Sequence, residues 1–142
     1  MYRKAYNFAC VLIVWTSSCS SPNFVEGEKG WVFLGERKVN HLYEKDVFRI
    51  KSRDKFTAVR LYVSERDIDI KDLEIMLING DILKPSIEST IRLGDRSRII
   101  DLAADGRQLE TITVRYRADG KLFSHKGKVQ IGGRPRNPND NY

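Results

Sequence analysis

The chain has 142 residues, and its 25 Lys and Arg against 19 Asp and Glu give a net charge of +6. This length fits one domain, and the apolar and charged fractions are those of a globular protein. The basic excess is too small for a nucleic-acid-binding protein, which needs a concentrated basic face. We therefore expect one domain and no nucleic-acid partner.

Residues 1–18 have the layout of a secretory signal. Arg3 and Lys4 precede an uncharged stretch in which Phe8 to Trp15 are all apolar. A membrane-spanning helix needs about 20 apolar residues, so this run is too short to span, whereas a basic start before a short apolar core is typical of a removable signal. We predict that residues 1–18 direct export and are removed, which leaves 23 basic against 19 acidic side chains.

The residues Thr16-Ser17-Ser18-Cys19 resemble the cleavage box of bacterial lipoprotein signals, in which small residues precede a cysteine that is acylated and becomes the new N-terminus. Thr16 departs from the pattern, since that position usually holds an aliphatic residue. The resemblance implies that Cys19 carries a lipid anchor on the periplasmic or outer-membrane side of the cell envelope. Conventional cleavage near Ser18 to Ser21, which would give a soluble secreted protein, is the alternative.

The cysteine count agrees with a lipid anchor. Cys10 lies inside the segment that would be removed, so Cys19 is the only thiol of the expected mature chain. A lone thiol in an oxidising compartment calls for a use, and acylation is one. No disulfide is then available, and the fold must be stabilised by its core.

Composition divides the rest of the chain into three parts. Residues 19–30 are rich in Ser, Pro, Gly and charge, and we interpret them as a lipid-anchored tether. Residues 31–131 hold nearly all the aliphatic side chains and are predicted to form the folded domain. Residues 132–142 contain Gly, Pro and Asn but no aliphatic side chain, so we expect a disordered tail.

Within the central part, apolar and polar residues alternate with a period of two, as Phe48 and Ile50 do with Arg49 and Lys51. This period predicts half-buried strands. We expect an all-β fold, an antiparallel β-sandwich or barrel of about eight or nine short strands. The expected strands are 31–39, 47–53, 56–64, 73–78, 82–84, 90–93, 98–102, 109–118 and 122–131.

Turn signals follow several of these strands. Asn79-Gly80, Asp105-Gly106 and Asp119-Gly120 tolerate the positive φ angles of tight hairpin turns, and they predict an antiparallel meander. A helix competes only over Asp67 to Ile78. We favour a strand there because the segment is rich in β-branched isoleucine.

The stretches WVFLGERKV and RLGDRSRIIDL, followed by a strand that contains Tyr116, resemble small exported bacterial β-sandwich domains of unknown function. The resemblance covers roughly Trp31 to Ile131. It implies a fold and a compartment, and it supplies no catalytic residues.

Catalytic and metal-binding patterns are weak. His41 and His125 lie in no nucleophile motif, and the carboxylates of RDIDIKDLE alternate with isoleucine, as on the solvent face of a strand. No phosphate-binding loop or zinc-binding cysteine pair is present in the sequence. We therefore expect no catalytic site, no metal and no cofactor.

The basic residues offer one spatial argument. If the apolar residues of each strand point inward, the intervening cations point outward and can align across neighbouring strands into a stripe that contacts anionic lipid or glycan. The alternative is that these cations protect and solubilise exposed strands. The expected stripe consists of Arg49, Lys51, Arg60, Arg115, Arg117, Lys126 and Lys128.

These features favour a non-enzymatic cell-envelope lipoprotein whose β-sandwich is a binding or interaction module at the membrane surface. Its partners would be the membrane, through the anchor, and an anionic lipid, a glycan or an envelope protein. The alternative is a small secreted hydrolase that acts on envelope polymers.

Overall fold

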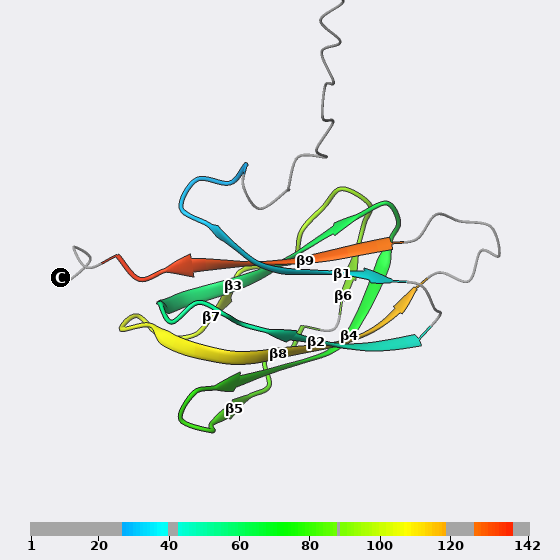
Figure 1. Ribbon diagram of the computed structural model, residues 1–142. Coiled ribbons are helices and arrows are strands. Elements are labelled where there is room, and N and C mark those ends of the chain that lie inside the picture. The colour runs from blue at the N-terminus through cyan, green and yellow to red at the C-terminus, as the bar shows by residue number, and fades with distance from the viewer. Residues whose placement is uncertain (1–26, 40–42, 88, 119–126, 138–142) are drawn as a thin grey trace, which may run out of the picture.

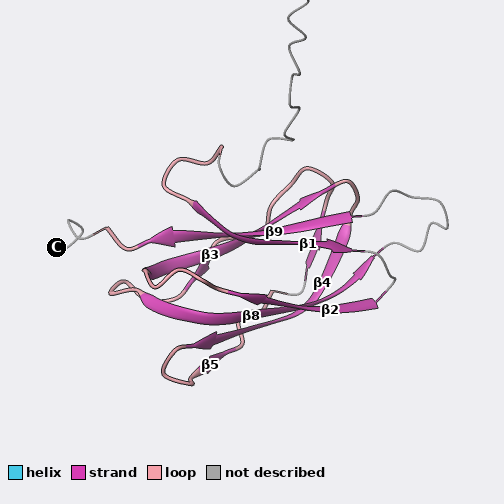
Figure 2. Cartoon of the chain, in the orientation of Figure 1, coloured by secondary structure: helices cyan, strands magenta, loops and turns pink. Residues whose placement is uncertain are grey.

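The computed structural model describes residues 27–39, 43–87, 89–118 and 127–137 (Figure 1). All regular structure in this part of the chain is strand, with loops between (Figure 2). The expectation of an all-β antiparallel fold is confirmed. The strands are β1 (Val32–Val39), β2 (Tyr43–Arg49), β3 (Lys55–Ser64), β4 (Ile68–Leu77), β5 (Ile82–Leu83), β6 (Ser89–Ile91), β7 (Ile100–Asp101), β8 (Arg107–Ala118) and β9 (Gly127–Pro135).

The strands form one curled sheet that folds into two layers. Layer A has the order β1-β9-β3, with β7 beside β3; layer B has the order β2-β8-β4, with β5 and β6 beside β4. Figure 1 shows β1, β9 and β3 lying over β2, β8 and β4. The layers are joined along one side, where Lys55 pairs with Gln108 and Phe56 with Arg107. The result is an antiparallel sandwich that is closed on that side.

The core lies between the two layers. Alternate apolar residues of β3 and β9 face those of β4 and β8, and each of these core side chains is almost wholly buried. Burial of one such Val, Leu or Ile side chain contributes about 1.5–3 kcal/mol relative to leaving it exposed. The core members from these four strands are Phe56, Val59, Leu61, Val63, Ile68, Ile70, Leu73, Ile75, Leu77, Leu109, Ile112, Val114, Tyr116, Val129 and Ile131.

The segment Asp67 to Ile78, for which the sequence also allowed a helix, forms strand β4 from Ile68. Its buried residues are Ile68 and Ile70, then Leu73, Ile75 and Leu77, so the alternation changes phase once. The register against β8 shifts between Ile70 and Asp72, as a β-bulge does. An extra residue in one strand returns the following side chains to the same face. The helix-like spacing in the sequence is therefore that of a bulged strand.

The expected meander is wrong. Asn79-Gly80 does form the tight turn between β4 and β5, with Gly80 at φ +89°. Asp105-Gly106 leads instead from β7, which pairs with β3, into β8, which pairs with β2, β4 and β3. Turn residues specify the local bend, whereas strand partners are chosen by burial of distant faces. Asp119-Gly120 lies outside the described residues.

Three strands have bounds that differ clearly from those expected. Strand β4 begins at Ile68, whereas the prediction began at Leu73. Strand β2 begins at Tyr43 and ends at Arg49, whereas the prediction ran from Val47 to Arg53. Strand β9 continues to Pro135, past the expected start of the tail at Gly132. A Cβ at Gly133 would lie 2.7 Å from side-chain atoms of Leu34 and Phe56, so this glycine is a core position rather than part of a tail.

Candidate binding groove between β1 and β2

The edges of the sandwich formed by β1 and β2 are open, and we call this region the open side. Strands β1 and β2 follow each other with only residues 40–42 between them, yet β1 belongs to layer A and β2 to layer B. Strand β1 pairs with β9, and β2 pairs with β8. Among the described residues, no strand pairs with the other edge of either one. Residues of both strands line a gap between these two edges, and Figure 1 shows β1 in the upper layer and β2 in the lower one.

A cavity of about 610 Å³ occupies this gap, and we call it the β1–β2 groove. Its volume falls in the range of ligand-binding pockets, about 300–1,000 Å³. Half of its lining is apolar, and Phe33 and Val47 are 41% and 40% exposed. The lining residues are Phe33, Leu34, Gly35, Arg37, Val47, Phe48, Arg49, Ile50, Lys51 and Ser52.

The charge of the groove is entirely positive. Arg37, Arg49 and Lys51 line it and are exposed, and none of the ten described lining residues is acidic. A concave surface lined by one sign of charge raises the local concentration of the opposite charge. The groove therefore combines an apolar floor with a preference for anions.

Arg37 bridges the gap. Its Nη2 donates a hydrogen bond to the Val47 carbonyl at 3.2 Å, and its guanidinium lies 5.5 Å from the centroid of the Phe48 ring. The guanidinium thus satisfies a carbonyl of β2 that a neighbouring strand would otherwise satisfy. A charged side chain that turns into an open edge also discourages uncontrolled strand pairing.

Gly35 lets the two layers approach each other behind this bridge. A Cβ at Gly35 would lie 3.1 Å from Cδ1 of Phe48, and the register of β1 against β9 shifts between Phe33 and Gly35. The shift places the apolar residues Phe33 and Leu34 at the groove.

Strand β2 is held to layer B by more than its backbone. The buried hydroxyl of Tyr116 on β8 interacts with Asp46 and with Glu44, whose Oε2 lies 3.0 Å away. Burial, followed by the hydrogen bonds to these carboxylates, raises the pKa of Tyr116 above its ordinary value. The hydroxyl therefore stays protonated and acts as a donor.

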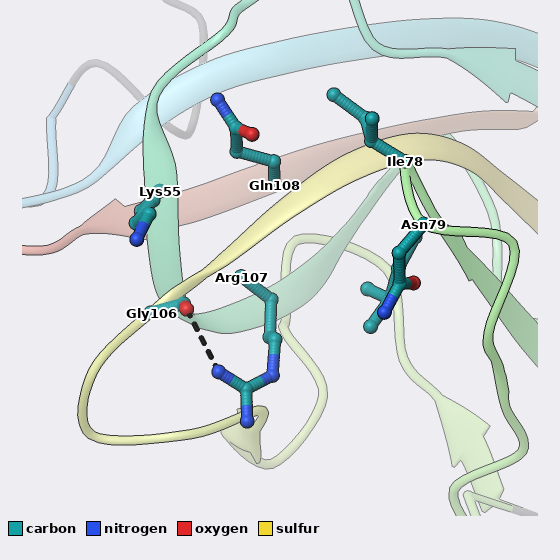
Figure 3. Close-up of a pocket in the computed structure, with 7 residues that line it drawn as sticks. Lys55, Ile78, Asn79, Gly106, Arg107 and Gln108 are labelled. Atoms are coloured by element: carbon teal, nitrogen blue, oxygen red, sulfur yellow. Dashed lines mark hydrogen bonds between the residues drawn. The ribbon is translucent and has the colours of Figure 1, made fainter.

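Two shallower hollows lie nearby. One of about 390 Å³ shares Ile50, Lys51 and Ser52 with the groove. The other, of about 250 Å³, lies at the joined side and is drawn in Figure 3. There Arg107 donates to the Gly106 carbonyl at 3.1 Å and pairs with Asp105, so its guanidinium is engaged locally. The β1–β2 groove is the largest of the three.

The structure does not assemble the expected basic stripe. Arg49 and Lys51 line the β1–β2 groove, and Lys126 lies outside the described residues. The others are split between the layers, with Arg60 and Lys128 in layer A and Arg115 and Arg117 in layer B. Three of them form ion pairs, which are Arg60 with Glu28, Lys128 with Glu36, and Arg115 with Asp72.

Sequence reasoning missed Phe33, Arg37 and Val47. A strand face was the simplest interpretation of each, because alternation reports which side of a strand a residue occupies and says nothing about which edges lack a partner. One signal was available, since Val32-Phe33-Leu34 places three apolar residues in a row where alternation allows fewer. Such a run in a half-buried strand indicates apolar surface outside the core.

The acidic residues of β4 point outward, as their alternation with isoleucine predicted. Asp69 lies 3.2 Å from Lys71, and Glu74 lies 3.3 Å from Lys84. Hydrogen bonds from Thr90 and Lys71 lower the pKa of Asp69. In the described part of the chain no three His, Cys, Asp or Glu side chains gather in a way that would hold a metal ion. His41 and His125 lie outside the described residues.

The fold and the groove define the class, a small antiparallel β-sandwich with one open, cation-lined side. The chain belongs to the family described as a domain of unknown function, DUF2541, whose pattern matches residues 8–133. No curated protein and no solved structure matches the chain. Within the described residues, no helix has the length and apolar character needed to cross a membrane.

Proposed function

We propose that this protein is an exported, lipid-anchored binding module of the cell envelope, without enzymatic activity, that holds an extended acidic segment of another envelope protein in the β1–β2 groove. The observation that carries the proposal is the pair of strand edges, unpartnered within the described residues, above an apolar groove lined by three cations.

The strand edges favour a peptide as the occupant. An extended peptide can add to an exposed edge, where main-chain hydrogen bonds provide affinity and pockets for alternate side chains provide specificity. Here the apolar floor, which includes Leu34, Phe48 and Ile50, would receive every second side chain of the peptide. The Val47 carbonyl, which Arg37 now satisfies, is a ready acceptor for the amide of an added strand.

The cations specify the charge of that peptide. Arg37, Arg49 and Lys51 would attract Asp or Glu at the positions that alternate with the apolar side chains. Charge complementarity of this kind governs the rate of encounter and the rejection of wrong partners more than it governs raw affinity. A peptide that alternates apolar and acidic residues therefore fits best.

A peptide-binding experiment tests the groove. The full-length chain in non-ionic detergent is titrated into a labelled octapeptide of alternating valine and glutamate, and fluorescence anisotropy is measured. We expect saturable binding that weakens at least about tenfold in the Arg49→Glu/Lys51→Glu variant, since the groove then repels the peptide. The matched control, Arg115→Glu/Arg117→Glu on layer B, should bind as the native chain does.

Three outcomes would overturn the peptide proposal. They are equal binding by the two double variants, equal binding of a valine–lysine octapeptide, and binding of the anionic amphiphile laurate without binding of the acidic peptide. If a self-associated form does not bind the peptide and binding appears only when dilution dissociates it, the groove belongs instead to a second copy of the chain.

The proposed location in the cell envelope is argued from the sequence. Residues 1–18 supply the export signal, and Cys19 would supply a multiply acylated anchor, which meets the requirement for at least two hydrophobic signals in stable membrane attachment. Cys19→Ser should move the protein from the membrane fraction to the soluble fraction of a bacterial host. Cys10→Ser is the matched control and should leave the partition unchanged, whereas unchanged partition of Cys19→Ser would contradict the anchor.

A further inference from the structure

A second charged cluster lies on the outer face of layer A and shares no residue with the groove. The carboxylate of Glu28 meets three donors there. Nη1 of Arg60 lies 2.6 Å from Oε1, Nη1 of Arg96 lies 3.2 Å from Oε2, and the hydroxyl of Tyr62 donates to Oε2. Three convergent donors on one carboxylate are the arrangement of an anion-binding site.

Contacts other than Glu28 hold Arg60 and the backbone of the Arg96 segment in place. Nε of Arg60 donates to the Ser97 carbonyl at 3.0 Å. The segment that carries Arg96 is tied to β3 by backbone hydrogen bonds, from the Ser97 amide to the Leu61 carbonyl at 2.8 Å and from the Val63 amide to the Asp95 carbonyl at 3.0 Å. The Arg60 guanidinium and the backbone that carries Arg96 are therefore positioned by the sandwich.

Burial strengthens the site. Tyr62 is only 1% exposed, and the side chain of Arg60 is 15% exposed. Desolvation and the nearby carboxylate raise the pKa of Tyr62, so its hydroxyl stays a proton donor. A partly buried guanidinium without an anion would be costly. The site consequently calls for a bound negative charge.

The negative charge is provided by Glu28, which does not lie in a strand. Glu28 belongs to a turn outside the strands, flanked by the exposed residues Gly27 and Lys29, and Gly30 has φ +85°. Figure 1 shows this segment in blue on the layer A side, just before β1. Next to it, the centroid of the Trp31 ring lies 5.5 Å from the guanidinium of Arg60 and 5.7 Å from that of Arg134. The carboxylate that contacts Arg60, Tyr62 and Arg96 therefore comes from a connecting turn rather than from a strand.

We propose that Arg60, Tyr62 and Arg96 form a carboxylate-binding site, that Glu28 occupies it within the same chain, and that the carboxylate of an acidic side chain or an acidic sugar replaces Glu28 when it binds. A group tethered by a short linker competes at an effective concentration in the millimolar range. Anions that bind the site weakly therefore do not displace Glu28. Replacement releases residues 27–31 from layer A, at the point where the proposed tether joins the domain.

Fluorescence of Trp31 tests this site. In the full-length chain with Trp15→Phe, Trp31 is the only indole, and it stacks on Arg60. Acetate is titrated at constant ionic strength, with chloride as the balancing anion. We expect a saturable change in Trp31 emission in the Glu28→Gln variant, with a midpoint at least tenfold lower in acetate than with Glu28 present.

Controls separate this site from general charge effects. Asp105→Asn removes an exposed carboxylate of equal charge elsewhere and should respond like the parent chain. Adding Arg60→Gln to Glu28→Gln should abolish the response. Glucuronate and N-acetylglutamate, titrated separately, then distinguish an acidic sugar from an acidic side chain as the natural source.

Absence of a saturable response in folded Glu28→Gln would overturn the proposal and leave Glu28 with a structural ion pair only. If that variant does not fold, the indole N–H resonance of Trp31 in the Glu28-containing parent is followed by NMR up to molar acetate. A shift no larger than that produced by chloride would overturn the proposal equally. Neither result bears on the peptide titration, which uses other residues and another probe.

Discussion

The edges of the two layers are treated in opposite ways at two places in the sandwich. On the joined side, β3 pairs with β8, and Phe56 beside that pairing is fully buried. On the open side, β1 and β2 lie in different layers, and Phe33 is 41% exposed. Backbone pairing hides strand edges, whereas unpaired edges are available to another chain. We therefore expect the joined side to contribute more to stability, and the open side remains the proposed binding site.

Removing one aromatic ring from each side gives the largest expected difference. Phe56→Ala should lower the free energy of unfolding by about 3–5 kcal/mol, because it leaves a cavity in the core. Phe33→Ala removes a half-exposed ring and should cost less than about 1 kcal/mol. Urea unfolding measures both values, and equal losses would contradict the division between the two sides.

Two glycines with positive φ allow a test of how tightly the joined side is packed. Gly106 has φ +74°, and a Cβ there would lie 2.8 Å from Cβ of Lys55; Gly80 has φ +89° and open space around it. Alanine at either position adopts a left-handed conformation that costs about 1–2 kcal/mol. Only Gly106→Ala adds a clash, worth about 1–3 kcal/mol more. Thermal melting should rank Gly106→Ala well below Gly80→Ala, and similar midpoints would show that the joined side can relax.

The open side depends on Tyr116 to hold β2. At neutral pH Tyr116→Phe should cost about 1–2 kcal/mol, because Asp46 and Glu44 lose a buried donor. The raised pKa of Tyr116 stabilises the folded state fully below its ordinary value of 10.0. Above that pH the unfolded chain ionises while the folded chain does not, so the contribution should fall by about 1.4 kcal/mol per pH unit.

The measurement for Tyr116 is the difference in unfolding free energy between the native chain and Tyr116→Phe at pH 7, 9 and 11. This difference removes the contribution of other groups that titrate in the same range. A difference that stays constant from pH 9 to pH 11 would contradict the role given to the Tyr116 hydroxyl.

The smallest effect is expected on the outer face of layer B, away from either side. Arg115 and Asp72 form an ion pair there whose side chains are 44% and 40% exposed. Solvent screens such a pair, so Arg115→Ala should cost less than about 0.5 kcal/mol. A double-mutant cycle with Asp72→Ala checks this value, and a coupling energy above about 1 kcal/mol would show that this face contributes to stability as the joined side does.

Much of the fold was accessible from alternation alone. The bounds expected for β1, β3 and β8 lie within two residues of those observed. The errors fall where alternation fails. Strand β9 ends in Gly132-Gly133-Arg134-Pro135, which has no aliphatic side chain, because those glycines leave room for Leu34 and Phe56. Strand β2 begins with charged residues whose inward-facing carboxylates bind Tyr116.

The candidate sites were less accessible. Arg49 and Lys51 were singled out as members of a stripe, and they line the β1–β2 groove together with Arg37, which was not. Glu28 was assigned to a tether, yet it reaches Arg60 across 32 positions of sequence. The lining of the groove and the contact of Glu28 with Arg60 both depend on which strands become neighbours. The pattern of charges along the chain does not specify those neighbours.

By itself, the sequence determined the all-β class, the positions of most strands, the outward direction of the acids on β4 and the expectation of export with an anchor at Cys19. Those conclusions follow from local periodicity and composition, which act over a few residues. The tertiary structure alone decided that β1 and β2 separate into different layers, that a cation-lined groove opens between them and that Glu28 fills a site on layer A. Each of these depends on long-range burial of strand faces, which selects partners far apart in the chain.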